Sequence, residues 1–156
     1  MKDVVVSRTA AAPLEVVWGL ATDLAAAPDH LSGVEKVEVL TPGGFDVGAR
    51  WRETRTMFGR AATEEMWVTA VEPVRSYTIE AESNGVHYVS TFLFEPADGG
   101  TRITLTFGGR ATGTGTRILG ALTGPLARRG IEKALRGDLD DLAGAAEARG
   151  ASSRGA

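Results

Sequence analysis

The chain has 156 residues, of which 43% are hydrophobic and 24% charged, and its formal net charge is −3. This length and composition are typical of one globular domain with an apolar core. No apolar run approaches the ~20 residues that a membrane-spanning helix needs. Residues 1–4 do not resemble a secretion signal. The absence of cysteine excludes disulfides, thiolate metal sites and cysteine nucleophiles. We therefore expect a cytoplasmic protein.

The charge distribution gives no reason to expect nucleic acid as a partner, because the net charge is negative. On a helix, charges three or four residues apart can pair. We therefore interpret the densest charges of the chain as one solvated helix face. They are Arg128, Arg129, Lys133 and Arg136, followed by Asp138, Asp140, Asp141 and Glu147.

The first part of the chain predicts a strand, two short helices and a second strand. Valine-rich residues 2–9 predict the first strand, and apolar residues recur at helical spacing over 14–21. Asp23 is expected to cap a second short helix at 24–27. Residues 34–39 predict the next strand, which ends at a Pro-Gly-Gly turn.

Five further strands follow at regular spacing. The Asn84-Gly85 pair is the strongest two-residue hairpin signal among their connections. Because most of these connections are short, we expect an antiparallel sheet of about seven strands. The five predicted strands span residues 47–57, 61–71, 76–83, 87–94 and 101–107.

The last part of the chain changes to a helical period. Apolar residues recur at i, i+4 and i+7, as on a helix that is buried along one stripe. Gly124-Pro125 is expected to kink or split the helix, because proline cannot donate to the helical ladder. We predict one domain over residues 1–149 and a disordered tail over 150–156. The stripe consists of Ile131, Leu135, Leu139, Leu142 and Ala146.

The predicted fold class is α+β, a helix grip in which a curved antiparallel sheet wraps around a long C-terminal helix. A sheet of this length with one covered face must curl. One helix fills only part of its concavity, so we expect a cavity between helix and sheet, where a small ligand would bind.

Five short motifs, together with Asp23 before Pro28, carry a resemblance that extends from Val4 to Glu147. Through them the chain resembles the SRPBCC superfamily, which contains START domains, birch-pollen allergen relatives and polyketide cyclase/dehydrase-like proteins. The resemblance implies a deep pocket for lipids, polyketides, sterols or other apolar molecules. It implies little about chemistry, because members range from carriers to cyclases. The motifs are Ala12–Trp18, Gly33–Val39, Val47–Trp51, Val71–Arg75 and Gly99–Ile103.

The sequence contains no motif of metal, phosphate or nucleophilic chemistry. Its two histidines, His30 and His87, are far apart, and no serine lies in a nucleophile elbow. We therefore expect no metal and no cofactor. Acid–base chemistry in the pocket remains open. Glu53 and Arg55 share a strand face and could form an ion pair, but strand parity alone leaves open which face of 50–57 or 62–69 is inward.

Candidate ligand-binding residues come from the most apolar strand faces and the helix stripe. In strand 87–94 the choice between the faces of His87 and Tyr88 stays open, so both are included. The candidates are Trp51, Tyr77, Ile79, His87, Tyr88, Phe92, Phe94, Ile103, Leu105, Ile131 and Leu135.

Three functions are compatible with these features. The first is binding or carriage of an apolar small molecule, such as a lipid, a polyketide or an aromatic compound. The second is a cyclase or dehydratase that uses acid–base residues of the pocket. The third is an interaction module with a filled cavity. A cavity smaller than about 300 Å³ would argue against the first. The sequence predicts neither the ligand nor whether the protein is a monomer or a homodimer.

Overall fold

The computed structural model describes residues 1–57, 59–113 and 115–154. Seven strands and a set of helices follow one another in the predicted order. The first five elements are β1 (Val4–Ala10), α1 (Leu14–Ala21), the 3-10 helix η1 (Leu24–Ala26), α2 (Ala27–His30) and β2 (Val34–Val39). The others are β3 (Arg50–Met57), β4 (Arg60–Glu72), β5 (Ser76–Ser83), β6 (Val86–Ala97), β7 (Gly100–Ala111), α3 (Thr116–Leu122) and α4 (Pro125–Arg154).

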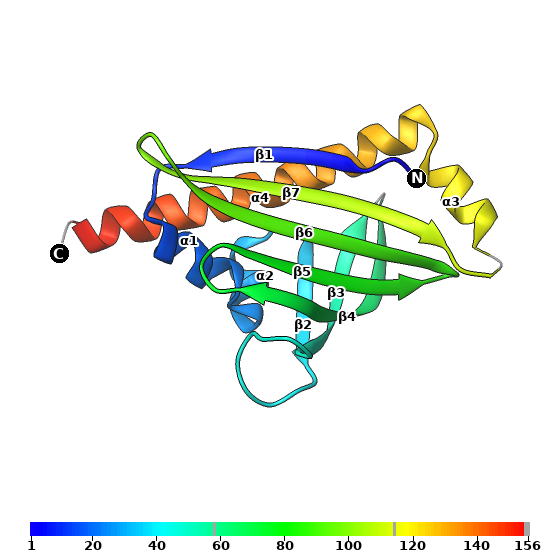
Figure 1. Ribbon diagram of the computed structural model, residues 1–156, viewed down its shortest axis with the longest axis horizontal. Helices are drawn as coiled ribbons and strands as arrows, with labels where there is room; N and C mark the ends of the chain where they lie inside the picture. Colours follow the sequence, from blue (N-terminus) through cyan, green and yellow to red (C-terminus); the bar gives the residue numbers. More distant parts are fainter. Residues whose placement is uncertain (58, 114, 155–156) are drawn as a thin grey trace.

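The strands form one antiparallel sheet with the order β1-β7-β6-β5-β4-β3-β2. Only β1 pairs with a strand distant in sequence, because it adds to the outer edge of β7. The long helix α4 runs along one face of this sheet, while α1 and α2 cover one end and α3 lies at the other (Figure 1). The predicted α+β helix-grip fold is therefore confirmed.

The hairpin between β5 and β6 fixes the register of the two strands. Asn84 and Gly85 have positive φ angles of 52° and 77°, as a two-residue hairpin turn requires. The tip of the hairpin also holds the chain that leads to α3. The N–H of Thr112 donates to the carbonyl of Gly85 at 2.6 Å. A side chain on Gly115 would overlap that same carbonyl, so glycine is required there.

The main core lies between α1, α4 and the β1–β7–β6 part of the sheet. Trp18 of α1 packs edge-on against Tyr77 and Phe94, with ring centroids 5.7 and 5.3 Å apart. The predicted helix stripe faces this core, with Leu139 and Ala146 fully buried. Because α4 packs most closely against β1 and α1, it stands farther from β3, β4 and β5.

Four details of the helices test or refine the sequence prediction. Asp23 makes no capping hydrogen bond from its side chain. The predicted helix at 24–27 is two elements, because Pro28 lies in the first turn of α2, where its missing N–H costs nothing. The predicted break at Gly124-Pro125 is confirmed, since α3 ends at Leu122 and α4 begins at Pro125. The predicted tail from residue 150 overlaps α4, and residues 155–156 lie outside the described part.

Two leucines of α4 provide a test of this packing. Leu139 is 1% exposed and Leu126 is 83% exposed. We expect Leu139→Ala to lower the free energy of unfolding by about 2–5 kcal/mol, because it leaves a cavity in the core. Leu126→Ala should change the free energy of unfolding by less than about 0.5 kcal/mol. Urea denaturation of both variants measures the difference, and equal effects would contradict the placement of α4.

Candidate functional site

A cavity of about 350 Å³ lies between α4 and the inner face of the sheet. It occupies the space that α4 leaves by packing toward β1 and α1. Strands β3 to β7 form one wall, α4 forms the opposite wall, and residues of α1, η1, α2 and α3 close the ends. The volume lies within the range of small-molecule binding sites. Most of the lining side chains are apolar.

Aromatic rings make up much of the sheet wall. Tyr77 stacks on Phe92 with ring centroids 4.8 Å apart, and Tyr88 stacks on Phe107 at 5.6 Å. These inward faces follow from the alternation of side chains along each strand. Eight of the candidate ligand-binding residues line the cavity. They are Trp51, Tyr77, Ile79, Tyr88, Phe92, Leu105, Ile131 and Leu135.

The other three candidates are not part of the described cavity wall. His87 lies on the outer face of β6, opposite to Tyr88, and its Nε2 lies 2.6 Å from the Glu80 carboxylate. Its ring also packs against the edge of Trp67. Phe94 and Ile103 face inward but belong to the main core, where they are at most 1% exposed. They lie beyond the cavity because α1 covers that end of the sheet.

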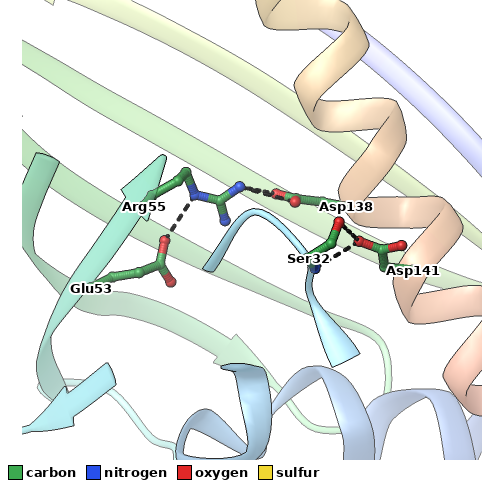
Figure 2. A network of polar contacts seen from close by, with 5 residues as sticks. All are labelled: Ser32, Glu53, Arg55, Asp138 and Asp141. Atoms are coloured by element: carbon green, nitrogen blue, oxygen red, sulfur yellow. Dashed lines mark hydrogen bonds and ion pairs between the residues drawn. The ribbon is translucent and has the colours of Figure 1, made fainter. Parts of the chain in front are cut away.

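Three charged side chains meet in the cavity wall (Figure 2). Arg55 of β3 donates through Nη1 to both carboxylate oxygens of Asp138, at 2.9 Å each. Its Nε donates to Glu53 at 3.3 Å. Their side chains are only 11–21% exposed. Arg55 and Asp138 therefore join β3 to α4 across the gap between them.

The loop before β2 supports this network from one side. The backbone N–H and the hydroxyl of Ser32 both donate to Asp141 of α4, at 2.9 and 2.7 Å (Figure 2). The next residue, Gly33, lies against the guanidinium group, since a β-carbon there would be 3.1 Å from Nη1 of Arg55. Glycine lets the loop pass close to Arg55 and holds the ion pair in place.

Burial alters the acid–base properties of the network. Desolvation raises the pKa of Glu53, and the attraction of Arg55 only partly offsets this effect. The pKa of Asp138 is raised for the same reason, again against the attraction of Arg55. Burial, followed by the charges of Glu53 and Asp138, raises the pKa of Tyr77 as well. The wall thus holds two carboxyl groups that protonate more readily than exposed ones.

One buried hydrogen-bond donor of the cavity wall lacks an acceptor among the described residues. The indole N–H of Trp51 is buried and has no partner among the described residues. Glu53 lies near it, but outside hydrogen-bond geometry. Tyr77, which carries a hydroxyl group, also lines the cavity. A buried donor without an acceptor is costly, so the indole N–H of Trp51 favours an oxygen atom supplied from the cavity.

Sequence analysis missed several polar residues of this site. Asp138 was assigned to a solvated helix face, where it would pair along the helix. It pairs with Arg55 instead, and Asp140 pairs across to Arg8 at 2.6 Å. The helical period contained the signal, because Asp138 lies seven residues after Ile131 and four before Leu142, on the buried stripe. Other missed lining residues include His30, Glu64, Glu80 and Ser90 among the polar ones, and Met66, Phe107, Leu122 and Ala134 among the apolar ones.

The sequence profile of the family "Polyketide cyclase / dehydrase and lipid transport" matches residues 1–147. The chain therefore belongs to this family, in agreement with the resemblance seen in its motifs. Its members share a fold that binds hydrophobic ligands. No curated protein sequence matches the chain significantly.

Solved structures with the same fold cover nearly the whole chain. TTHA0849 from Thermus thermophilus is 25% identical, with a TM-score of 0.77 over 95% of this chain and 99% of that one. The ZhuI aromatase/cyclase from Streptomyces sp. R1128 is also 25% identical, with a TM-score of 0.73 over 95% and 94%. The two-domain ARO/CYC protein StfQ of the steffimycin pathway is 15% identical, with a TM-score of 0.76 over 94% and 51%. That last likeness shows the fold alone.

Neither a metal site nor a membrane span is found in the described ranges. No three His, Cys, Asp or Glu side chains in residues 1–57, 59–113 and 115–154 are arranged to hold a metal ion. No helix in these ranges is long and apolar enough to cross a membrane.

Asp138→Asn tests the electrostatics of the network. Burial raises the pKa of Asp138 in the folded protein above its ordinary value of 3.8. At a pH between the ordinary and the raised pKa, the folded state binds more protons than the unfolded state. The aspartate therefore loses stability as the pH rises through this window, whereas asparagine does not. We expect the free energy of unfolding of the native protein, minus that of Asp138→Asn, to fall as the pH rises from the ordinary pKa of aspartate, 3.8, through the raised pKa of Asp138. Urea titrations measure it, and a difference that grows with pH would contradict the raised pKa.

Proposed function

We propose that this protein binds and carries a compact apolar molecule with one or more aromatic or fused rings and at least one oxygen function. The cavity between sheet and α4 is the observation that supports this proposal. Its volume of about 350 Å³ lies near the lower limit for small-molecule sites, which favours a ring system over a long-chain lipid. The stacked pairs Tyr77–Phe92 and Tyr88–Phe107 offer flat surfaces to such rings.

The oxygen function is inferred from the one buried donor that lacks a partner among the described residues. A carbonyl or hydroxyl oxygen near Trp51 would accept the indole N–H, and the hydroxyl of Tyr77, which also lines the cavity, offers a second polar group to the ligand. The burial that raises the pKa of Glu53 and Asp138 also favours a neutral ligand over an anionic one, because an anion would be desolvated at the same place beside two carboxyl groups. An interaction module with a filled cavity is less compatible with this interior, because the protein's own side chains leave a cavity of about 350 Å³ between the sheet and α4.

A substitution that fills the cavity tests the proposal. Ala134 lines the cavity from α4, whereas Ala148 of the same helix is exposed. We expect Ala134→Trp to weaken binding of the neutral fluorescent probe N-phenyl-1-naphthylamine by about tenfold or more, because the indole occupies the ligand's place. Ala148→Trp should bind the probe as the native protein does. Fluorescence titration measures both, with circular dichroism to confirm the fold, and equal affinities would contradict an internal site.

A second candidate function is cyclisation or dehydration of a bound polyketide-like chain. The Glu53–Arg55–Asp138 network favours it, because two carboxyl groups with raised pKa values line the same cavity as the ligand. Carboxyl groups with raised pKa values can act as general acids and bases. A cavity that holds a flexible chain in one folded conformer would supply the rest of the rate enhancement.

Glu53→Gln separates this second function from simple binding. With a linear poly-β-ketone thioester as substrate, we expect the variant to lose about 10²-fold or more of any cyclisation rate, because glutamine cannot exchange a proton. Affinity for the neutral probe should be retained. The exposed Glu95→Gln serves as the matched control. Mass spectrometry of the product, which has lost water, gives the rate. An unchanged cyclisation rate in Glu53→Gln would show that Glu53 transfers no proton in the reaction.

A further inference from the structure

The junction of α3 and α4 combines exposed apolar side chains with positive charge. We define the elbow as residues 116–133, which contain α3, its link and the first turns of α4 (Figure 1). Leu126 is 83% exposed and Ile118 is 39% exposed, and they belong to the short set of large apolar side chains of the described chain that face solvent. Exposed apolar side chains that gather in one region often mark an interaction site.

The charge of this region is opposite to that of the rest of the chain. Residues 116–137 contain five cationic residues and one acidic residue, in a protein with a formal charge of −3. Two of the cations are occupied: Arg128 donates to the carbonyls of Lys2 and Asp3, and Arg136 pairs with Glu132 at 2.8 Å. The other three are exposed and pair with no described carboxylate. They are Arg117, Arg129 and Lys133.

The helical period places the groups that lie on α4 together. Leu126, Arg129 and Lys133 follow one another at i, i+3 and i+7, so they share one face of α4. That face is opposite to the buried stripe of Ile131 and Leu139. Asp140, farther along the same face, is engaged by Arg8. The exposed face of the elbow is therefore cationic with an apolar tip.

We propose that this elbow docks on an anionic lipid surface. The cations match phosphate headgroups, each contributing about fivefold in affinity near such a membrane. Leu126 and Ile118 match the apolar boundary just below the headgroups. A nucleic acid would satisfy the cations but would leave the leucine in water. A bilayer surface accommodates both features, and it is the partner that the combination favours.

The elbow also forms part of the cavity wall. Leu122, the last residue of α3, lies four residues after Ile118 and four before Leu126, and it lines the cavity. Contact between the elbow and a membrane would thus bring the apolar interior of the protein next to the apolar interior of the bilayer. If the proposed ligand binding holds, this arrangement lets ligand pass between the two without crossing water. Docking itself does not depend on that function.

Vesicle flotation of the full chain tests the docking surface. We expect binding to vesicles of phosphatidylcholine with phosphatidylglycerol, little binding to phosphatidylcholine alone, and release at high salt. Leu126→Asp should weaken the binding about tenfold or more. The double variant Arg129→Glu/Lys133→Glu should do the same, because it reverses two of the three free charges.

Matched controls are available at exposed positions outside the elbow. Val47→Asp, in the loop after β2, replaces an exposed apolar residue with aspartate, as Leu126→Asp does. Lys36→Glu, in β2, reverses an exposed positive charge. Both variants should leave vesicle binding unchanged. All variants should keep the native melting temperature and affinity for the neutral probe, which separates this surface from the cavity. The proposal is overturned if anionic vesicles do not bind the native protein, or if the elbow variants bind like the controls. It is also overturned if Leu126→Asp alone is silent, or if its only effect is to dissociate a dimer.

Discussion

The ion pair between Arg55 and Asp138 is the interaction on which the interior of this protein depends. It joins β3 to α4 where the helix stands away from the sheet, at 2.9 Å and largely shielded from water. Elsewhere α4 is held by apolar packing against β1 and α1 and by exposed polar contacts such as Arg8–Asp140 and Ser32–Asp141. Removing one partner from a buried pair leaves the other charge uncompensated, at a cost of about 3–5 kcal/mol. The pair therefore fixes the helix at a distance that keeps a space beneath it.

The space that results is apolar on most sides and polar at one place. Stacked rings from β5, β6 and β7 face it, while Glu53, Arg55 and Asp138 concentrate the charge at the β3 side. This asymmetry orients a ligand, because an oxygen atom of the ligand gains a hydrogen bond beside the unpartnered indole N–H of Trp51. The same carboxyl groups that give orientation in a carrier could move protons in an enzyme. One arrangement thus underlies both proposed functions.

Most of the fold was predictable because its signals are local. Strand alternation, the Asn84-Gly85 turn and the helical stripe from Ile131 to Ala146 each need only a short stretch of sequence. The polar site depends on contacts between distant segments. Glu53 and Arg55 were predicted as a possible pair, yet nothing in β3 alone showed that their face is inward. Asp138 was assigned to the solvated face because of its charge, although its position in the helical period lies on the buried stripe. The orientation of His87 stayed open, because alternation along a strand defines two faces but does not show which one is inward.

The most direct measurement of the central claim is the location of a bound ligand by methyl nuclear magnetic resonance. Protein with labelled Ile, Leu and Val methyl groups would be titrated with N-phenyl-1-naphthylamine. An internal site predicts shifts and intermolecular contacts at Ile79, Leu105 and Leu135, which line the cavity. Shifts confined to exposed methyl groups such as those of Val5, Val39 and Val47 would show that the cavity takes no ligand and would contradict the account.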